Sequence, residues 1–392
     1  MHELHAVLDA WRGLGDAVGD AVLATVVHVS GSAYRRPGAR MLILPHGRRV
    51  GTVSGGCLEG EIARKAWWYT DSADAVVRVY DTSSGDDAVL EFGLGCNGVV
   101  HVMLERLTRA GTGEYLEFLD AHRHLRRPVA VATLIAAAPG ASVAPGDRLF
   151  VNERGVAGGA LARLEAEDIV EDTRRALATR QSFLAHTVCG DVFVEYVAPP
   201  VDLVIFGAGD DAQPLTAMAA QLGWCVTVAD GRPLYARPDR FPDAARVVVM
   251  AKDDLLRDIV ITPDTLVVMM THNYPLDTRL VPLVLERHPR YLGVLGPRHR
   301  AERLFDELAL AIPDYVHAPV GLDLGGDTPA SIALSILSEA QATLSGRAAT
   351  MLRERDAAIH APVHEVGDSG NALPLPHERP AYCETMVGSH AA

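Results

Sequence analysis

The chain has 392 residues, of which 48% are hydrophobic and 22% charged, and its 36 Lys and Arg against 50 Asp and Glu give a formal net charge of −14. This length predicts two or three domains with cores of their own, and the composition excludes a disordered chain or a coiled coil for most of it. An acidic surface repels phosphate backbones and anionic lipids, so nucleic acid is not an expected partner. The chain does not start with a basic segment followed by an apolar one, and no apolar run is long enough to cross a bilayer. We therefore expect a cytoplasmic protein without a membrane span.

The first half of the chain ends at the proline pair Pro199-Pro200. Before this pair, strand-like runs mix with helical ones, which predicts an N-terminal accessory domain of α+β type over residues 1–199. One order of elements occurs there twice, at about 21–107 and 128–197, as a weak internal duplication.

The duplication serves as an internal control on which residues the fold requires. Arg40 of the first copy aligns with Arg148 of the second, whereas the second copy has no counterpart of the Gly-Gly-Cys segment or of the Arg pair that follows Tyr34. A residue that only one copy carries is not required by the shared fold. We therefore expect the chemistry in the first copy and a scaffold in the second.

The second half, residues 200–347, alternates apolar strands with helical segments, which predicts a Rossmann-like, doubly wound parallel sheet. The expected fold class is thus α/β, with an N-terminal α+β domain in front of the Rossmann-like domain. Residues 348–392 are rich in proline, glycine and polar residues, and we expect no fixed structure there.

The first strand of this sheet runs into the turn Gly207-Ala208-Gly209, and Asp230 ends the next strand. Glycines at such a turn allow a diphosphate to approach a helix N-terminus, and an acidic residue at the second strand binds ribose hydroxyls. Asp210 and Asp211, however, bring two negative charges to the expected diphosphate site. The alternative is that the glycines only close the turn between strand and helix.

Later loops follow the carboxyl ends of other strands in this sheet, the edge where such folds bind ligands. His272 is a candidate general base, with loop ordering as its alternative. Arg298 or Arg300 could bind a phosphate, or could be solvated side chains at a helix start. Thr328, followed by Pro329, has the pattern of a helix N-cap.

Five cysteines are spread over the chain without a CxxC pair, which favours free thiols over disulfides. Cys57 follows Gly55 and Gly56 at the start of a predicted helix, where amide groups lower the pKa of a thiol, and it is the best candidate for a reactive thiol. Cys96 lies between glycines in the same way, although Cys189 occupies a roughly equivalent place in the second copy.

The remaining cysteines suggest no chemistry. Cys225 lies in an apolar strand and is expected in the core, and Cys383 lies in the tail. A zinc site built from Cys57, Cys96 and His101 lacks the spacing typical of zinc ligands.

The loop before the second strand of the first copy carries three arginines within six residues: Arg35, Arg36 and Arg40. In an acidic chain this cluster is a candidate anion site, because arginine binds phosphates and oxyanions bidentately. The alternative is that these arginines pair with surface carboxylates.

These motifs form an ordered set that resembles the xanthine dehydrogenase accessory factor family, XdhC/CoxI. The resemblance covers most of residues 21–347 and is carried by GSAYRRPGARMLI, VGTVSGGCLEGE, LGCNG, VDLVIFGAGDDAQPL, VADGR, THNYPLD, YLGVLGPRHRAERL and GLDLGGDTPASIALSILSE. It implies a non-catalytic maturation factor that binds molybdenum cofactor and protects it while a cysteine desulfurase supplies the sulfido ligand. The factor then delivers the cofactor to a molybdenum hydroxylase apoenzyme.

The family's two motif cysteines fall on Cys57 and Cys96. At the second of them the family often has GCGG, where this chain has Cys96-Asn97-Gly98. The residues agree with such a ligand, because a soft thiolate at Cys57 suits a molybdenum contact and glycine turns suit a phosphate. We expect the cofactor, in its molybdopterin or nucleotide form, between the two domains.

Two other hypotheses stay open at this point. An NAD-dependent oxidoreductase would bind NAD or another nucleotide through Gly207, Gly209 and Asp230 and use His272 as acid and base, but would leave the Gly-Gly-Cys segment unexplained. A scaffold would bring the desulfurase and the target enzyme together without any small ligand. A homodimer is compatible with the repeated sheets.

Overall fold

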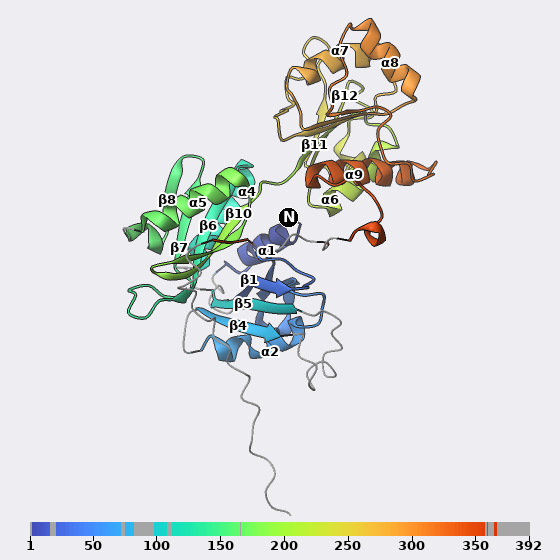
Figure 1. The fold of residues 1–392 in the computed structure, drawn as a ribbon. Helices are drawn as coiled ribbons and strands as arrows, with labels where there is room; N and C mark the ends of the chain where they lie inside the picture. The colour runs from blue at the N-terminus through green and yellow to red at the C-terminus, as the bar shows by residue number, and fades with distance from the viewer. Residues whose placement is uncertain are drawn as a thin grey trace, which may run out of the picture. The chain divides into compact units, whose positions relative to one another are not determined.

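The computed structural model of the chain divides into two compact units, and the division falls between Pro199 and Pro200 (Figure 1). Of the described residues, those within 3–199 and 364–366 belong to the N-terminal unit, and His2 and those within 200–359 belong to the C-terminal unit. The structure describes residues 2–15, 21–71, 75–81, 98–107, 112–164, 166–356, 359 and 364–366.

The first sheet of the N-terminal unit is antiparallel, with the strand order β3-β2-β1-β5-β4. The first eight residues of β1 are all buried, because α2 covers one face of the sheet and the second sheet packs on the other. The described elements of this part are α1 (His2–Arg12), β1 (Val22–Gly31), β2 (Arg40–Ile43), the 3₁₀ turn η2 (Pro45–Gly47), β3 (Arg49–Gly51), α2 (Glu59–Tyr69), β4 (Ala75–Asp81) and β5 (Gly98–Arg106).

The second sheet repeats this topology. Its order β9-β10-β6-β7-β8 matches the first sheet strand for strand, with α5 in the place of α2. The two halves thus share one chain path, as a duplication produces. The described elements of this part are α4 (Thr112–Leu125), β6 (Val129–Ala137), β7 (Arg148–Asn152), β8 (Gly155–Gly158), the 3₁₀ turn η3 (Ala160–Arg163), α5 (Glu167–Thr179), β9 (Phe183–Thr187) and β10 (Gly190–Val197).

The two sheets bury apolar side chains against each other. Met103 of β5 and Phe193 of β10 belong to one cluster with side chains of β1, β4, β6 and β9. A second cluster joins α1 and α4 to both sheets, and it includes the fully buried Leu8 and Leu116. The two copies therefore share two buried clusters, in addition to the cluster that each copy forms beneath its own helix.

A short strand from the tail extends the second sheet. β17 (His364–Val366) pairs in parallel with β9, with His364 opposite Phe183. From its composition, the segment 348–392 is expected to have no fixed structure, and at β17 the structure differs from that expectation. β9 is the outer strand among β6–β10, so its free edge offers backbone groups with which even a short extended segment can pair.

The C-terminal unit has a six-stranded parallel sheet in the order β13-β12-β11-β14-β15-β16. This is the order 3-2-1-4-5-6 of a Rossmann fold, and the predicted fold class is confirmed. The described elements are β11 (Asp202–Phe206), α6 (Ala212–Gln221), β12 (Cys225–Asp230), η4 (Pro238–Arg240), β13 (Arg246–Val249), β14 (Leu266–Met269), α7 (Tyr274–Leu285), β15 (Tyr291–Val294), α8 (Arg298–Glu307), β16 (Val316–His317), α9 (Pro329–Ser345) and η5 (Leu352–Glu354).

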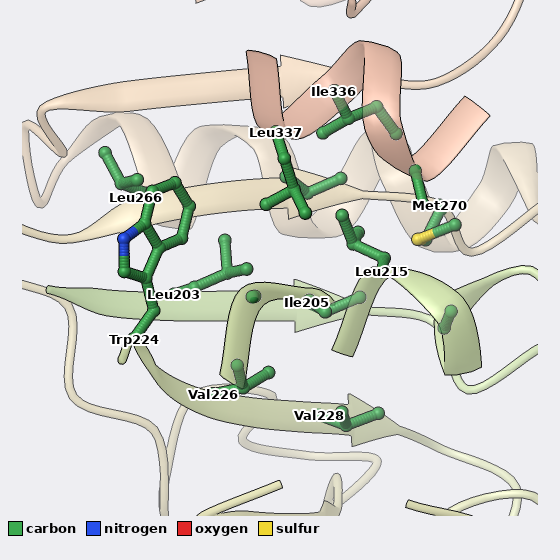
Figure 2. Close-up of a cluster of buried hydrophobic side chains, with 14 of the residues drawn as sticks. Leu203, Ile205, Leu215, Trp224, Val226, Val228, Leu266, Met270, Ile336 and Leu337 are labelled. Carbon is green, nitrogen blue, oxygen red and sulfur yellow. The ribbon is translucent and has the colours of Figure 1, made fainter. Parts of the chain in front are cut away.

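Helices cover both faces of this sheet. Figure 2 shows one face, where side chains of β11, β12 and β14 meet α6 and α9; the labelled residues include Leu203, Ile205, Val226, Val228, Leu215, Ile336 and Leu337. On the other face, α7 and α8 bury Leu280 and Leu304 against the same strands. Because both faces are covered, the strands are apolar without alternation. A ligand site in this sheet is therefore expected where the strands end.

Within the described part of the chain, none of the helices combines the length and the apolar character that a membrane crossing requires.

Candidate functional site

The glycine turn after β11 is needed first for packing. Gly207 has φ +119°, and a Cβ at this position would lie 2.3 Å from the carbonyl oxygen of Met270. Only glycine allows the ends of β11 and β14 to approach so closely. At Gly209 a Cβ would meet only the side-chain Oδ1 of Asp211, which can move. Gly207 is thus explained by the turn, and Gly209 is the glycine that the packing does not require.

The carboxylate of Asp230 is buried and fully engaged. Its Oδ2 accepts hydrogen bonds from the Ala208 N–H at 2.8 Å and from Arg232 Nη2 at 2.7 Å, and its Oδ1 accepts from the Arg232 backbone N–H and Nε. Burial acts to raise the pKa of Asp230, but these hydrogen bonds outweigh it and lower the pKa. Ribose hydroxyls would therefore have to compete with Arg232 for this carboxylate. Reasoning from the sequence missed Arg232, although it stands two residues after Asp230 in the VADGR motif.

The two acidic residues of the turn each have a cationic or imidazole partner. Asp210 Oδ1 lies 2.7 Å from Arg240 Nη2, and Arg240 also donates to the carbonyl of Ala208. Asp211 Oδ2 lies 2.7 Å from His272 Nε2, and His272 has φ +52°, which is uncommon for a residue with a side chain. The contact with Asp211 supports the loop-ordering interpretation of His272.

A cavity of about 510 Å³ opens beside this turn, at the carboxyl ends of β12, β13 and β14 and the start of α7. Of the predicted residues, Gly207, Asp230 and His272 line it. Arg298 does not: it is exposed at the start of α8. Arg300 is held by the buried carboxylate of Asp277, at 2.6 Å, and is thus assigned a structural contact.

In the N-terminal unit, the loop before α2 presents Cys57 at the surface. The loop is fixed from inside by Glu59, whose carboxylate accepts from the backbone N–H groups of Val53 and Ser54 and from Ser54 Oγ at 2.5 Å. Ser54 Oγ in turn accepts from the backbone N–H of Leu58. Burial acts to raise the pKa of Glu59, but the hydrogen bonds from Ser54 and the backbone outweigh it and lower the pKa. A rigid, exposed thiol loop results.

The arginine loop lies against this thiol loop. A Cβ at Gly55 would lie 3.4 Å from Cγ of Tyr34, so the aromatic ring covers the glycine backbone while 69% of Tyr34 stays exposed. A Cβ at Gly98, the end of the GCNG motif, would lie 2.3 Å from the carbonyl oxygen of Ser32. Three motifs separated in the sequence therefore converge on one edge of the first sheet. Cys96 itself lies outside the described residues.

The three arginines of the loop do not act together. Arg35 pairs with Glu3 of α1 and Arg36 is half-buried. Arg40 is buried, donates to the carbonyl of Gly38 at 2.6 Å and pairs with Glu195 of β10. Arg40 is therefore assigned to the core rather than to an anion site, because its guanidinium donates hydrogen bonds to protein acceptors.

The other described cysteines are less accessible than Cys57. Cys189 and Cys225 are half-buried, and burial raises the pKa of the Cys189 thiol. Among the residues that the structure describes, no three His, Cys, Asp or Glu side chains are grouped so that they could hold a metal ion.

Comparison with known proteins extends over both units. The family model described as the XdhC and CoxI family matches residues 16–81, and the XdhC Rossmann domain matches residues 203–340. The chain is 32% identical over 340 residues to a probable xanthine dehydrogenase subunit of Bacillus subtilis strain 168, covering 86% of this chain and 97% of that protein. It is 26% identical over 325 residues to the molybdenum cofactor insertion chaperone PaoD of Escherichia coli K12, covering 81% and 82%.

A solved structure has the same fold. The crystal structure described as a xanthine dehydrogenase from Bacillus halodurans matches with a TM-score of 0.71 and 29% identity, covering 88% of this chain and 98% of that one. The family motifs, the Rossmann sheet and the length of the matches agree: this chain belongs to the XdhC and CoxI family.

Proposed function

We propose that this chain is a maturation factor that binds molybdenum cofactor as its cargo, protects it during sulfuration and delivers it to a molybdenum hydroxylase of the xanthine or CO dehydrogenase type. The observation that carries the proposal is the exposed Cys57 of the first copy, on a loop that Glu59 fixes and whose Gly55 packs against Tyr34. The corresponding segment of the second copy has no such thiol, so the shared fold does not require it. The likeness to PaoD, a molybdenum cofactor insertion chaperone, supports the same role.

The residues fit this cargo chemically. A thiolate is a soft ligand that suits a molybdenum and sulfur centre, and Gly56, the residue before Cys57, has open space where a side chain would be. Arg35 and Arg36 lie close by in the chain, although Arg35 is paired with Glu3. The family pattern adds Cys96 as a second thiol for the cofactor. When bound, the cofactor supplies the molybdenum centre that the target enzyme needs. The chain's own residues hold it.

The oxidoreductase alternative finds less support in the contacts. Asp230, the expected ribose acceptor, is engaged by Arg232, so a nucleotide's ribose would have to displace that contact. The contact of His272 with Asp211 does not count against the alternative, because a carboxylate commonly orients an acid-base histidine.

Cargo binding is tested by metal and pterin analysis of protein purified from cells grown with molybdate. We expect molybdenum and a fluorescent pterin to co-purify with the native protein and to fall at least fivefold in Cys57→Ala. Cys189→Ala is the matched control, because Cys189 is a half-buried thiol of the second copy, and it should retain both. Equal retention in Cys57→Ala and Cys189→Ala would overturn the role of Cys57.

Sulfuration and delivery need a separate assay with a cysteine desulfurase and a molybdenum hydroxylase apoenzyme. We expect activity of the apoenzyme to appear only when the loaded chain and the desulfurase are both present. Activation that is equally fast without this chain would argue against a delivery role, whatever the metal analysis shows.

A further inference from the structure

Basic side chains from three separate elements line the cavity of the C-terminal unit. Arg232 follows β12, Lys252 follows β13 and Arg279 lies on α7. Arg279 Nη2 donates to the carbonyl of Lys252 at 2.6 Å, which ties the helix to the loop after β13. Asp230 is the one carboxylate among the described residues of the lining, and it is paired with Arg232. The lining therefore carries net positive charge in a chain whose net charge is −14.

The glycine turn carries two acidic residues, of which Asp210 is paired with Arg240. Asp210 and Asp211 stand where a dinucleotide-binding turn receives the diphosphate, and the side chain of Asp210 is 91% exposed. The N–H of Ala208, which could otherwise face a phosphate, donates to Asp230. A diphosphate at this turn would meet two carboxylates with fewer amide donors. An anionic group is favoured in the basic cavity instead.

Arg232 is oriented for a ligand by its neighbours. Its Nε and Nη2 bind Asp230, and its guanidinium lies 4.0 Å from the ring centroid of Tyr235. The side chain nevertheless remains 52% exposed, and no described residue accepts a hydrogen bond from its Nη1. A planar guanidinium fixed on one edge and free on the other can bind a phosphate without losing much conformational entropy.

We propose that the cavity binds a terminal phosphate monoester of a nucleotide-like or pterin ligand through Arg232, Lys252 and Arg279. The cavity prefers this group to an unphosphorylated ribose, because Asp230, the carboxylate that would bind the ribose, is occupied by Arg232. A diphosphate at the glycine turn is disfavoured because of the two carboxylates there. This inference deepens the proposed function and rests on it for the natural ligand: the terminal phosphate of the pterin cargo and the 2′-phosphate of a nucleotide have the same chemistry.

The test is calorimetric titration of the full chain with two matched pairs of probes. NADP⁺ and NAD⁺ differ by one phosphate monoester, as do 2′-AMP and adenosine. We expect the phosphorylated member of each pair to bind at least tenfold more tightly. Lys252→Ala and Arg279→Ala should each reduce that preference at least threefold. These two variants are chosen because Arg232→Ala would leave the buried Asp230 carboxylate without its arginine partner.

Arg237→Ala is the control, because Arg237 pairs with an aspartate two residues away, as Arg232 does, but lies outside the cavity lining. It should leave the preference unchanged. Equal affinity within each pair of probes, or a preference that survives in both Lys252→Ala and Arg279→Ala, would overturn the proposal.

Competition on cargo-loaded protein distinguishes the two ligand sources. Release of pterin by 2′-AMP but not by adenosine assigns the site to the pterin phosphate. Binding of 2′-AMP without pterin release assigns it to a separate nucleotide. Because the probe titrations need no molybdenum, their failure would be distinguishable from failure of the cargo assay with Cys57→Ala.

Discussion

Arg40 and Glu195 form a buried ion pair, with Nη2 and Oε2 2.5 Å apart, that joins the first copy of the N-terminal unit to the second. Arg148 and Glu105 form its counterpart at 2.6 Å, with the arginine now in the second copy and the glutamate in the first. The two guanidinium carbons lie 5.5 and 4.2 Å from the ring centroid of Tyr115. The duplication thus exchanges its ion pairs between copies, so neither copy can satisfy its buried charges alone.

Replacing Arg40 by methionine should lower the free energy of unfolding of the N-terminal unit by about 3 to 5 kcal/mol, because it leaves the buried Glu195 carboxylate unpaired. Chemical denaturation followed by far-UV circular dichroism measures this. Arg64→Met, on the exposed surface of α2, is the control and should change stability by less than about 0.5 kcal/mol. The double variant Arg40→Met, Glu195→Leu should recover most of the loss. A single variant as stable as the control would contradict the assignment.

The sequence could have identified the structural role of Arg40, because Arg148 aligns with it and a residue present in both copies belongs to the shared fold. By the same reasoning, Cys57, which has no counterpart in the second copy, is predicted not to be required by the shared fold. The Rossmann sheet was predictable because long apolar strands alternate with helices over the whole second half. The pairing of Asp210 with Arg240 could not be predicted from the sequence, because 30 residues separate the two and only the fold brings them together.

Glu59→Gln should loosen the thiol loop and lower the stability of the N-terminal unit by about 1 to 2 kcal/mol, since an amide replaces an acceptor of the Ser54 hydroxyl. The pKa of Glu59 lies below the usual 4.5, so its contribution is complete above that pH and is lost as the pH falls through the folded value. The difference in unfolding free energy between native and variant protein should therefore be larger at pH 7 than at pH 3.5.

Glu61→Gln is the matched control for that experiment, because Glu61 forms a surface pair with Lys65 one helical turn away, at 2.9 Å. Such pairs contribute about 0.3 to 0.5 kcal/mol. If the two variants lost equal stability, or if the Glu59→Gln effect did not depend on pH, the hydrogen bonds of Glu59 would not be what fixes the loop.

Cys57 should react with a thiol reagent at least tenfold faster than Cys189 in the native protein at pH 7.5. Cys57 is exposed, whereas Cys189 is half-buried and its pKa is raised by burial and by Asp168, which lowers the thiolate fraction. Peptide mapping after short exposure to iodoacetamide assigns the labelled residues. The difference should disappear in denaturant. Equal labelling of the two cysteines in the folded chain would show that the loop does not present its thiol as the structure has it.

Gly207→Ala and Gly209→Ala should separate the packing role of the turn from a ligand role. At Gly207, φ is +119° and the new Cβ would lie 2.3 Å from the Met270 carbonyl, so the backbone must move and stability should fall by about 2 kcal/mol or more. At Gly209 the new Cβ meets only the movable Asp211 side chain, and the loss of stability should stay below about 1 kcal/mol. Thermal unfolding of both variants measures the difference.

Binding of NADP⁺ should survive in Gly209→Ala, because the phosphate is expected in the basic cavity and not at the turn. A Gly209→Ala variant that folds normally but no longer binds NADP⁺ would place the phosphate at the turn after all.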